Sequence, residues 1–309
     1  MAANVLKAGY ELVVYDIRRE MGNNLEDAGA EWAASPMDVA ARSEEVFSSL
    51  PGPPEVESVV LGDEGVFAGL SRGAGYIDTS TNAPSTMPNI AEIGTSSGFC
   101  VLDAPISGGV FGARDATLTV FVGGEKAHLD RFAPVLQSIG KNVVHMGPAG
   151  CGNVTKLVNN LIMFINFIGG CEGMAMGARA GIDPQSLLDV IKPSTGDSMI
   201  LRRTMGLFLR GEQMCSATDL AVKDMRLAVE LGKEIDDRRS LKRLYTAISE
   251  RNVIRLSSKM RYYAVKCGAK VVTDNFLSVD SERLSRVQRT SKSLLHNPLK
   301  RGYRVRKIH

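Results

Sequence analysis

Short apolar runs alternate with amphipathic segments from the start of the chain to about residue 147, and this alternation constrains the fold more than any other feature. Six apolar runs are expected to be β-strands: residues 11–15, 46–50, 76–79, 99–104, 118–122 and 143–146. Amphipathic helices are expected between them, over residues 84–94 and 126–139 among others. Apolar strands that alternate with helices predict a parallel sheet with helices on both faces.

The pattern changes at residues 147–150, where Gly-Pro-Ala-Gly interrupts the chain. Four helices and no strands are expected after it, over residues 153–180, 184–191, 200–209 and 218–232. We therefore expect an α/β, Rossmann-like dinucleotide-binding domain over residues 1–150 and an all-α domain over residues 151–235. The length and the apolar character of the first helix favour a homo-oligomer.

A third segment, residues 236–309, differs from the rest in charge. Acidic residues outnumber basic ones before residue 236 and basic ones dominate after it, so the net charge of +3 is the sum of two opposite excesses. Such a basic segment can bind nucleic acid or another acidic surface. Because no nucleic-acid motif accompanies it, we interpret it as a divergent or mistranslated solvated tail and do not expect nucleic acid as a partner.

Several classes of protein and site are disfavoured. Hydrophobic residues make up 44% of the chain, which excludes a disordered chain. The five cysteines are widely spaced and form no C-x-x-C pair, which favours free thiols in the cytoplasm or another reducing compartment and no metal site. The start carries no secretory signal, and asparagines interrupt the most apolar stretch, residues 157–170, so no membrane span is expected.

An acidic residue ends the first apolar run. In a dinucleotide-binding fold an acid at the end of the second strand hydrogen-bonds the ribose of NAD and repels the 2′-phosphate of NADP. Asp16 suits this role, although Arg18 and Arg19 follow closely and Asp16 alone also fits a solvated turn.

Two further motifs could hold and turn over a substrate. Ser107, Gly108 and Gly109 follow a strand and offer a hydroxyl and approachable backbone amides to a carboxylate, or simply reverse the chain. Lys156 and Asn160 share one face of the long helix. Apolar neighbours would desolvate Lys156 and lower its pKa toward the range useful for proton transfer, unless the side chain reaches solvent.

A fourth motif is the neighbouring pair Lys223 and Asp224 in the last expected helix. Such a pair usually marks a solvated helix surface. Taken in order, these motifs resemble the β-hydroxyacid dehydrogenase family, in the branch of 3-hydroxyisobutyrate dehydrogenase and tartronate semialdehyde reductase. The segments that carry the resemblance are residues 4–16, 50–57, 78–84, 103–109, 118–124, 150–160 and 220–224.

The resemblance implies a role for each matching position. Lys156 would be the general acid/base on the substrate hydroxyl. The carboxylate of a small 3-hydroxy acid would be held by Ser107, Gly108 and Gly109, with Asn160 orienting the substrate. The positions implied to contact the dinucleotide, NAD rather than NADP, are Asp16, Leu50, Pro51, Thr81 and Lys223.

The chain also departs from the family. The family starts with a strand and a Gly-x-Gly-x-x-Gly turn that binds the pyrophosphate, whereas residues 1–4 here correspond to the helix after that turn. We therefore expect a truncated dinucleotide-binding domain that lacks this strand and loop. Two hypotheses follow: an NAD-dependent 3-hydroxyacid dehydrogenase, or a catalytically impaired remnant that acts at most as an oligomerising subunit.

Overall fold

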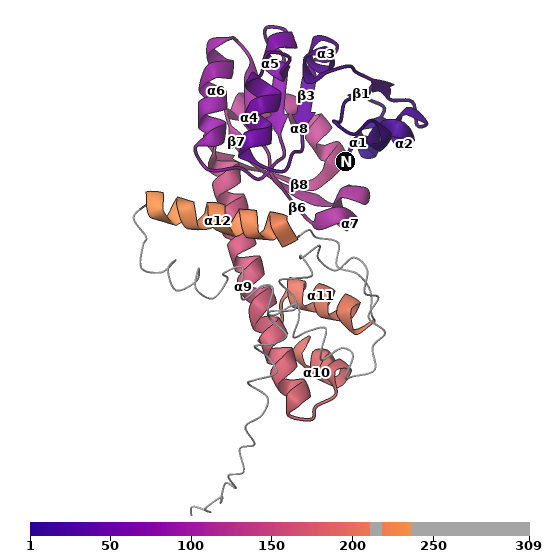
Figure 1. The fold of residues 1–309 in the computed structure, drawn as a ribbon, viewed down its shortest axis with the longest axis vertical. Coiled ribbons are helices and arrows are strands. Elements are labelled where there is room, and N and C mark those ends of the chain that lie inside the picture. The colour runs from indigo at the N-terminus through magenta and orange to yellow at the C-terminus, as the bar shows by residue number, and fades with distance from the viewer. Residues whose placement is uncertain (211–217, 236–309) are drawn as a thin grey trace, which may run out of the picture.

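The computed structural model describes residues 1–210 and 218–235 (Figure 1). In chain order the elements of the first part are α1 (Ala2–Lys7), β1 (Val13–Val14), a 3-10 helix (Arg19–Gly22), α2 (Asn23–Glu26), β2 (Glu31–Trp32), α3 (Pro36–Ala41), β3 (Glu45–Ser48), α4 (Pro53–Leu61), α5 (Val66–Gly69), β4 (Gly75–Asp78), α6 (Thr86–Ser96), β5 (Cys100–Asp103), β6 (Ile106–Ser107), α7 (Gly109–Arg114), β7 (Leu118–Gly124), α8 (Lys126–Ile139) and β8 (Gly140–Gly147). Four helices follow: α9 (Cys151–Arg179), α10 (Pro184–Ile191), α11 (Met199–Leu209) and α12 (Thr218–Glu234). The predicted basic segment, residues 236–309, lies outside the described residues.

The main sheet has six strands in the order β3-β4-β5-β7-β6, with β8 also paired to β7. β3, β4 and β5 run parallel, as do β7 and β8, in agreement with the predicted parallel sheet. The prediction is wrong for β7, which runs antiparallel to both β5 and β6. The cause at β6 is the short connection through α7, because a parallel pair needs a crossover of about a dozen residues or more.

β1 and β2 form a separate parallel pair, with Val13 opposite Glu31 and Val14 opposite Trp32. Among the described residues no ladder joins this pair to the six-stranded sheet. Residues 2–7 form the helix that the resemblance implies, and the Asn4 amide nitrogen donates to the Ala113 carbonyl at 2.8 Å.

Alternate residues of the central strands enter two apolar clusters on opposite faces of the sheet. Tyr76 of β4 packs in the cluster that includes Val56 of α4, whereas its neighbour Ile77 packs with Phe132 and Leu136 of α8. This alternation is the period of two that a pleated strand imposes. Both faces of the main sheet are therefore covered by helices, as predicted.

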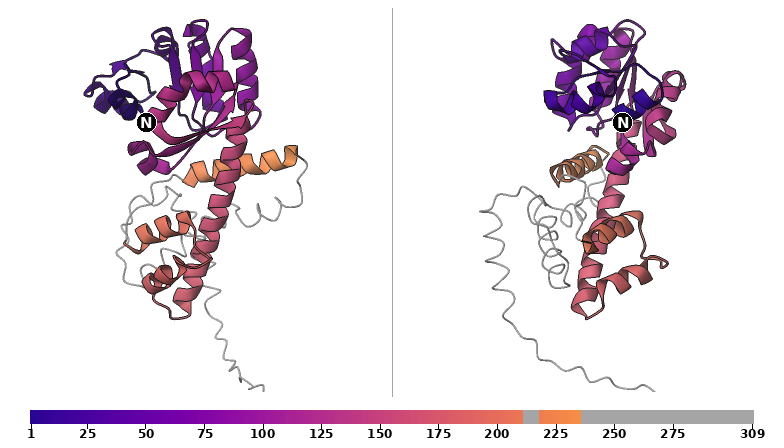
Figure 2. Two further views of the ribbon diagram at one scale, coloured as in Figure 1. Left: turned by 180° about the vertical axis from the view of Figure 1, so that it is seen from behind. Right: turned by 90° about the vertical axis from the view of Figure 1, so that its right-hand side faces the viewer.

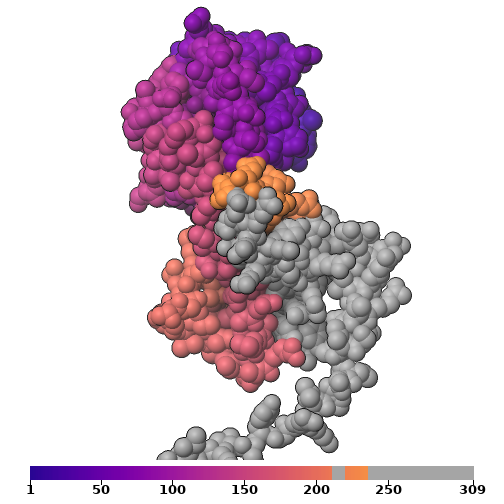
Figure 3. All heavy atoms as spheres, turned by 90° about the vertical axis from the view of Figure 1, so that its left-hand side faces the viewer, coloured from indigo at the N-terminus to yellow at the C-terminus, as the bar shows by residue number. Residues whose placement is uncertain are grey.

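The helical part is arranged along α9, which leaves the α/β part and extends well beyond it (Figures 1 and 2). α10 and α11 pack against its far end, where Cys171, Met174 and Leu188 belong to one apolar cluster. α12 crosses α9 near the start of α9. In Figure 3, α12 lies directly against the α/β part. Within the described residues Cys100, Cys151 and Cys171 are free thiols.

By length and composition alone, α9 meets the criteria for a membrane-spanning helix, which differs from the prediction made from residues 157–170. Its first turns are packed into the α/β part and its far end carries α10 and α11. These contacts hold both ends of α9 within the fold, while 11% of its apolar stretch is buried. No membrane is indicated.

Candidate active site

The carboxyl ends of β3, β4 and β5 lie side by side, and the loops that follow them carry several of the predicted site residues. The register pairs Ser48, Asp78 and Asp103 across the ends of the three strands. Leu50 and Pro51 follow β3, and Thr81 follows β4. In open α/β sheets, ligands bind at this edge.

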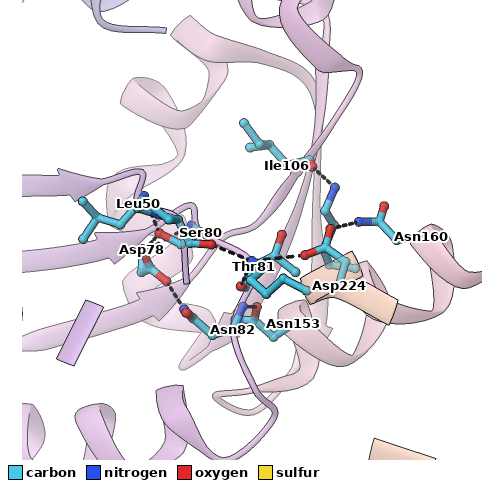
Figure 4. Close-up of polar contacts among 12 residues, drawn as sticks. Leu50, Asp78, Ser80, Thr81, Asn82, Ile106, Asn153, Asn160 and Asp224 are labelled. Atoms are coloured by element: carbon cyan, nitrogen blue, oxygen red, sulfur yellow. Dashed lines mark hydrogen bonds and ion pairs between the residues drawn. The ribbon is translucent and has the colours of Figure 1, made fainter. Parts of the chain in front are cut away.

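Asp78 is fully buried and holds the loops after β3 and β4 in place (Figure 4). Its carboxylate accepts hydrogen bonds from the Ser48 and Ser80 hydroxyls, each at 2.6 Å, and from the Asn82 amide at 2.5 Å. Burial raises the pKa of Asp78, and these hydrogen bonds oppose the rise. Because the Ser80 hydroxyl also accepts from the Leu50 backbone N–H at 2.8 Å, the two loops are fixed relative to each other.

Asp103 attaches the start of α9 to the sheet. Its carboxylate accepts from the backbone N–H groups of Gly150 and Asn153, each at 2.8 Å, and from the Asn153 side-chain amide at 3.2 Å. The Asn153 side-chain oxygen in turn accepts from the Asn82 backbone N–H at 2.7 Å. A carboxylate at a helix N-terminus satisfies N–H groups that have no partner within the helix.

Lys156 lies one turn further along α9, and its ammonium nitrogen donates to the Ile106 carbonyl at 2.7 Å. Burial lowers the pKa of Lys156, the direction expected from its apolar neighbours. The negative charge of Asp224 opposes this effect, and the positive charge of Lys223 adds to it. The side chain is thus largely desolvated and points at the turn of Ser107, Gly108 and Gly109, which directly follows Ile106.

That turn needs glycine at two positions. The φ angles are 136° at Gly108 and 64° at Gly109, a region that residues with a Cβ atom rarely adopt. Ser107 ends β6, opposite Thr119 of β7, so the turn is anchored to the sheet on one side. Lys156 and the predicted carboxylate-binding residues are therefore brought together.

Asn160 donates from its side-chain amide to Asp224 at 2.6 Å, and Asp224 also forms an ion pair of 3.1 Å with Lys223. Asp224 is buried, with 8% of its surface exposed, so the interpretation of this Lys-Asp pair as a solvated surface is wrong for the aspartate. No short-range pattern indicates this contact, because Asn160 and Asp224 are 64 residues apart.

Lys223 connects α12 to the loops that follow β3 and β4. Its ammonium nitrogen donates to the carbonyls of Pro51 and Thr81, each at 2.7 Å. Lys223 thus joins the loops of Pro51 and Thr81 to Asp224. Asp224 in turn contacts Asn160 (Figure 4), and its charge acts on Lys156. Leu50 directly precedes Pro51.

Asp16 is placed apart from this group, after β1 in the separate two-stranded sheet. Its carboxylate accepts from the Arg18 backbone N–H at 2.8 Å. Arg19 is engaged elsewhere, because it pairs with Glu26 at 2.5 Å and stacks over Trp32. Within residues 1–210 and 218–235, no group of three or more His, Cys, Asp or Glu side chains is arranged to hold a metal ion.

Chemically, the assembled group offers a desolvated amine beside a turn with approachable backbone, and two rigid loops at a sheet edge. A desolvated amine exchanges protons more readily near neutral pH than a solvated lysine does. The arrangement suits proton transfer to and from a small polar molecule bound beside the Lys156 amine.

Family models match both parts of the chain. Residues 1–147 match a family model described as the NAD binding domain of 6-phosphogluconate dehydrogenase, and residues 150–251 match one described as the NAD-binding region of NADP-dependent 3-hydroxyisobutyrate dehydrogenase. The two models together extend over most of the chain.

Individual proteins that resemble the chain are dehydrogenases. The chain is 41% identical to 3-hydroxyisobutyrate dehydrogenase of Pseudomonas aeruginosa over 65% of its own length and 67% of the relative. It is 34% identical to 2-(hydroxymethyl)glutarate dehydrogenase of Eubacterium barkeri over 76% of its length and 78% of the relative. A crystal structure of 3-hydroxyisobutyrate dehydrogenase from Salmonella typhimurium superposes with a TM-score of 0.71 at 26% identity, covering 86% of this chain and 89% of that one.

Proposed function

Because the chain belongs to the β-hydroxyacid dehydrogenase family and is an oxidoreductase by that resemblance, we propose that it transfers a hydride between a 3-hydroxy acid and its semialdehyde, with NAD as the partner. The substrate is of the 3-hydroxyisobutyrate type. The observation that carries the proposal is the desolvated Lys156, held 2.7 Å from the Ile106 carbonyl beside the turn of Ser107, Gly108 and Gly109.

The described residues fit the nicotinamide end of a dinucleotide. Lys223 fixes the carbonyls of Pro51 and Thr81, and a Cβ atom at Gly52 would lie 3.1 Å from the Lys223 side chain. Leu50, Pro51, Thr81 and Lys223 would contact the cofactor, which accepts the hydride when bound.

We infer NAD rather than NADP from the ribose end. Asp16 carries a negative charge that would repel a 2′-phosphate. Arg19, a candidate partner for that phosphate, is already paired with Glu26. The Arg18 side chain lies 3.9 Å from the Asp16 carboxylate, which offsets its positive charge.

Lys156 acts as the general base in alcohol oxidation and as the general acid in the reverse direction. In its neutral form the amine takes the proton of the substrate hydroxyl as the hydride leaves the carbinol carbon. Ser107, Gly108 and Gly109 hold the carboxylate, and Asn160, fixed by Asp224 at 2.6 Å, orients the hydroxyl-bearing carbon. Backbone and side-chain contacts thus hold the substrate, and one side chain moves the proton.

The test is the formation of NADH from NAD⁺ and 3-hydroxyisobutyrate, followed by absorbance. Lys156→Met is expected to lower kcat about 10³-fold, in the range typical of a lost general acid/base. Lys192→Met is the matched control, since Lys192 directly follows α10 and pairs with Asp189 at 2.8 Å. Equal activity of the two variants would contradict the proposal.

Calorimetric titration with NAD⁺ separates this proposal from that of a catalytically impaired remnant. Stoichiometric binding of NAD⁺ together with turnover that depends on Lys156 supports the dehydrogenase. Absence of both supports an oligomerising subunit without activity.

We further infer a homo-oligomer, assembled through the outer face of α9, in the cytoplasm or another reducing compartment. Val158, Ile162 and Met176 on this helix expose 46%, 54% and 72% of their surfaces. A row of exposed apolar side chains on one helix is typical of an interface between protein copies. Light scattering coupled to size exclusion measures the oligomeric state.

A further inference from the structure

Arg203 reaches the substrate turn from outside the residues discussed so far. It lies on α11, below β6 and α7 in Figure 1, and its Nη1 atom donates to the Gly108 carbonyl at 3.1 Å. Its guanidinium carbon lies 4.9 Å from the centre of the Phe111 ring. A Cβ atom added to Gly109 would lie 3.5 Å from Nη2, so the guanidinium directly covers this glycine.

The charge of Arg203 has no protein counterpart in the part of the chain that the structure describes. The neighbouring Arg202 pairs with Asp197 at 3.2 Å, whereas Arg203 pairs only with a carbonyl and a ring. A guanidinium has five N–H donors in a fork that fits a carboxylate. The half-buried Arg203 therefore retains donors for an anion from outside the protein.

The position of the guanidinium distinguishes this anion from the carboxylate already assigned to the turn. The Gly108 carbonyl and the Gly109 N–H belong to one trans peptide unit and point in opposite directions. Arg203 occupies the carbonyl side, whereas a carboxylate bound to the Gly109 amide occupies the other. From standard bond lengths the guanidinium and that carboxylate are separated by roughly 8 Å at most, a span that a five-carbon diacid covers.

We propose that Arg203 binds a second carboxylate, so that among acids of the 3-hydroxyisobutyrate type the site prefers those that carry a second carboxylate in place of a hydrogen on the methyl side chain or its extension. The inference rests on the proposed function, since it deepens the substrate class of the same site. The matched substrates are 3-hydroxyisobutyrate and 2-(hydroxymethyl)glutarate. They share the carboxylate and the hydroxymethyl group, and the second replaces a methyl by a carboxyethyl group.

The test compares kcat/KM for the two acids. Arg203→Gln is expected to lower kcat/KM for the dicarboxylic acid about 30-fold more than for the monocarboxylic acid, because a charged hydrogen-bonded pair is lost. Arg203→Lys should recover part of the preference, and Arg202→Gln should leave the ratio unchanged. An equal fall for both acids in Arg203→Gln would mean that Arg203 only shapes the turn, and would overturn the inference.

Binding of unreactive analogues distinguishes failure of this inference from failure of the proposed function. Calorimetry with 2-methylglutarate and isobutyrate, which lack the hydroxyl, requires no turnover. A preference for 2-methylglutarate that disappears in Arg203→Gln supports the second anion site even if no NADH forms. Turnover of 3-hydroxyisobutyrate without such a preference leaves the dehydrogenase intact and removes the second site.

Discussion

The start of helix α9 and the rest of the helix have different surroundings. In the first ten residues the polar side chains of Asn153 and Asn160 are buried and hydrogen-bonded. Further along the helix, apolar side chains such as Ile162 and Met176 are exposed on one face, whereas Cys171 and Met174 on another face are buried. The helix therefore buries polar side chains near its start and exposes apolar ones on one face beyond it.

This difference shows which contacts each part of the helix finds within a single copy of the chain and which it does not. Burying polar groups is favourable only when partners satisfy them, and here Asp103, Asn82 and Asp224 come from three different elements. Exposing apolar groups is unfavourable unless another surface covers them. The contacts near the start are completed by the chain itself, whereas the exposed apolar face further along is where we propose that a second copy packs.

The largest expected effect concerns the start of α9. Asp103→Ala leaves the N–H groups of Gly150 and Asn153 without their acceptor, and should lower the free energy of unfolding by about 3 kcal/mol. Urea denaturation measures the change. Asp115→Ala is the control, since the exposed Asp115 pairs only with the adjacent Arg114. A loss below about 1 kcal/mol in Asp103→Ala would mean that the carboxylate does not anchor α9.

The next effect concerns the exposed apolar face of α9. Ile162→Glu places a charge on the exposed apolar face and should weaken self-association at least about tenfold, or about 1.4 kcal/mol. Sedimentation equilibrium measures the association. Ile17→Glu is the control, because Ile17 is 90% exposed and lies far from α9 in the chain. Unchanged association in Ile162→Glu would place the interface elsewhere.

A smaller effect concerns α10, which packs against the far end of α9. The Asp183 carboxylate caps α10 by accepting from the Ser186 backbone N–H at 2.8 Å. Asp183→Ala should cost about 1 kcal/mol of unfolding free energy, and Asp183→Asn clearly less. Thermal unfolding monitored by circular dichroism measures both, with activity toward 3-hydroxyisobutyrate retained. Loss of activity in Asp183→Ala would show that the activity depends on the stability of α10.

The smallest expected effect is a shift in a pH profile. In the proposed mechanism oxidation needs the neutral amine of Lys156, so kcat/KM should rise with pH through the pKa of Lys156, which burial lowers below 10.5. Asp224 raises that pKa, so Asp224→Asn should move the midpoint to lower pH, while the new amide oxygen still accepts from Asn160. Lys223→Met should move it in the opposite direction. Midpoints that move together in both variants would contradict this electrostatic account.

Local patterns predicted much of the fold. The ends of α8 and α10 agree with the predicted residues 126–139 and 184–191, because each helix has a clear amphipathic pattern and α10 begins with an Asp-Pro cap. The antiparallel pairing of β7 was missed, since the residues of a strand do not encode the direction of its neighbour.

The candidate site was predictable only in part. The apolar neighbours of Lys156 in sequence indicated its desolvation. The burial of Asp224 depends on how α12 packs across α9, and the approach of Arg203 to Gly108 joins residues 95 positions apart. Such contacts arise from tertiary packing, which no short-range pattern records.

The two lysines of the site share a property that bears on how the site could be re-engineered. Lys156 bonds to the carbonyl of Ile106, and Lys223 bonds to the carbonyls of Pro51 and Thr81, so every one of these acceptors is a main-chain atom. A main-chain acceptor survives any substitution that preserves the backbone. The side chains at positions 51, 81 and 106 can therefore be randomised in a library that seeks new substrates or cofactors, while both lysines stay anchored.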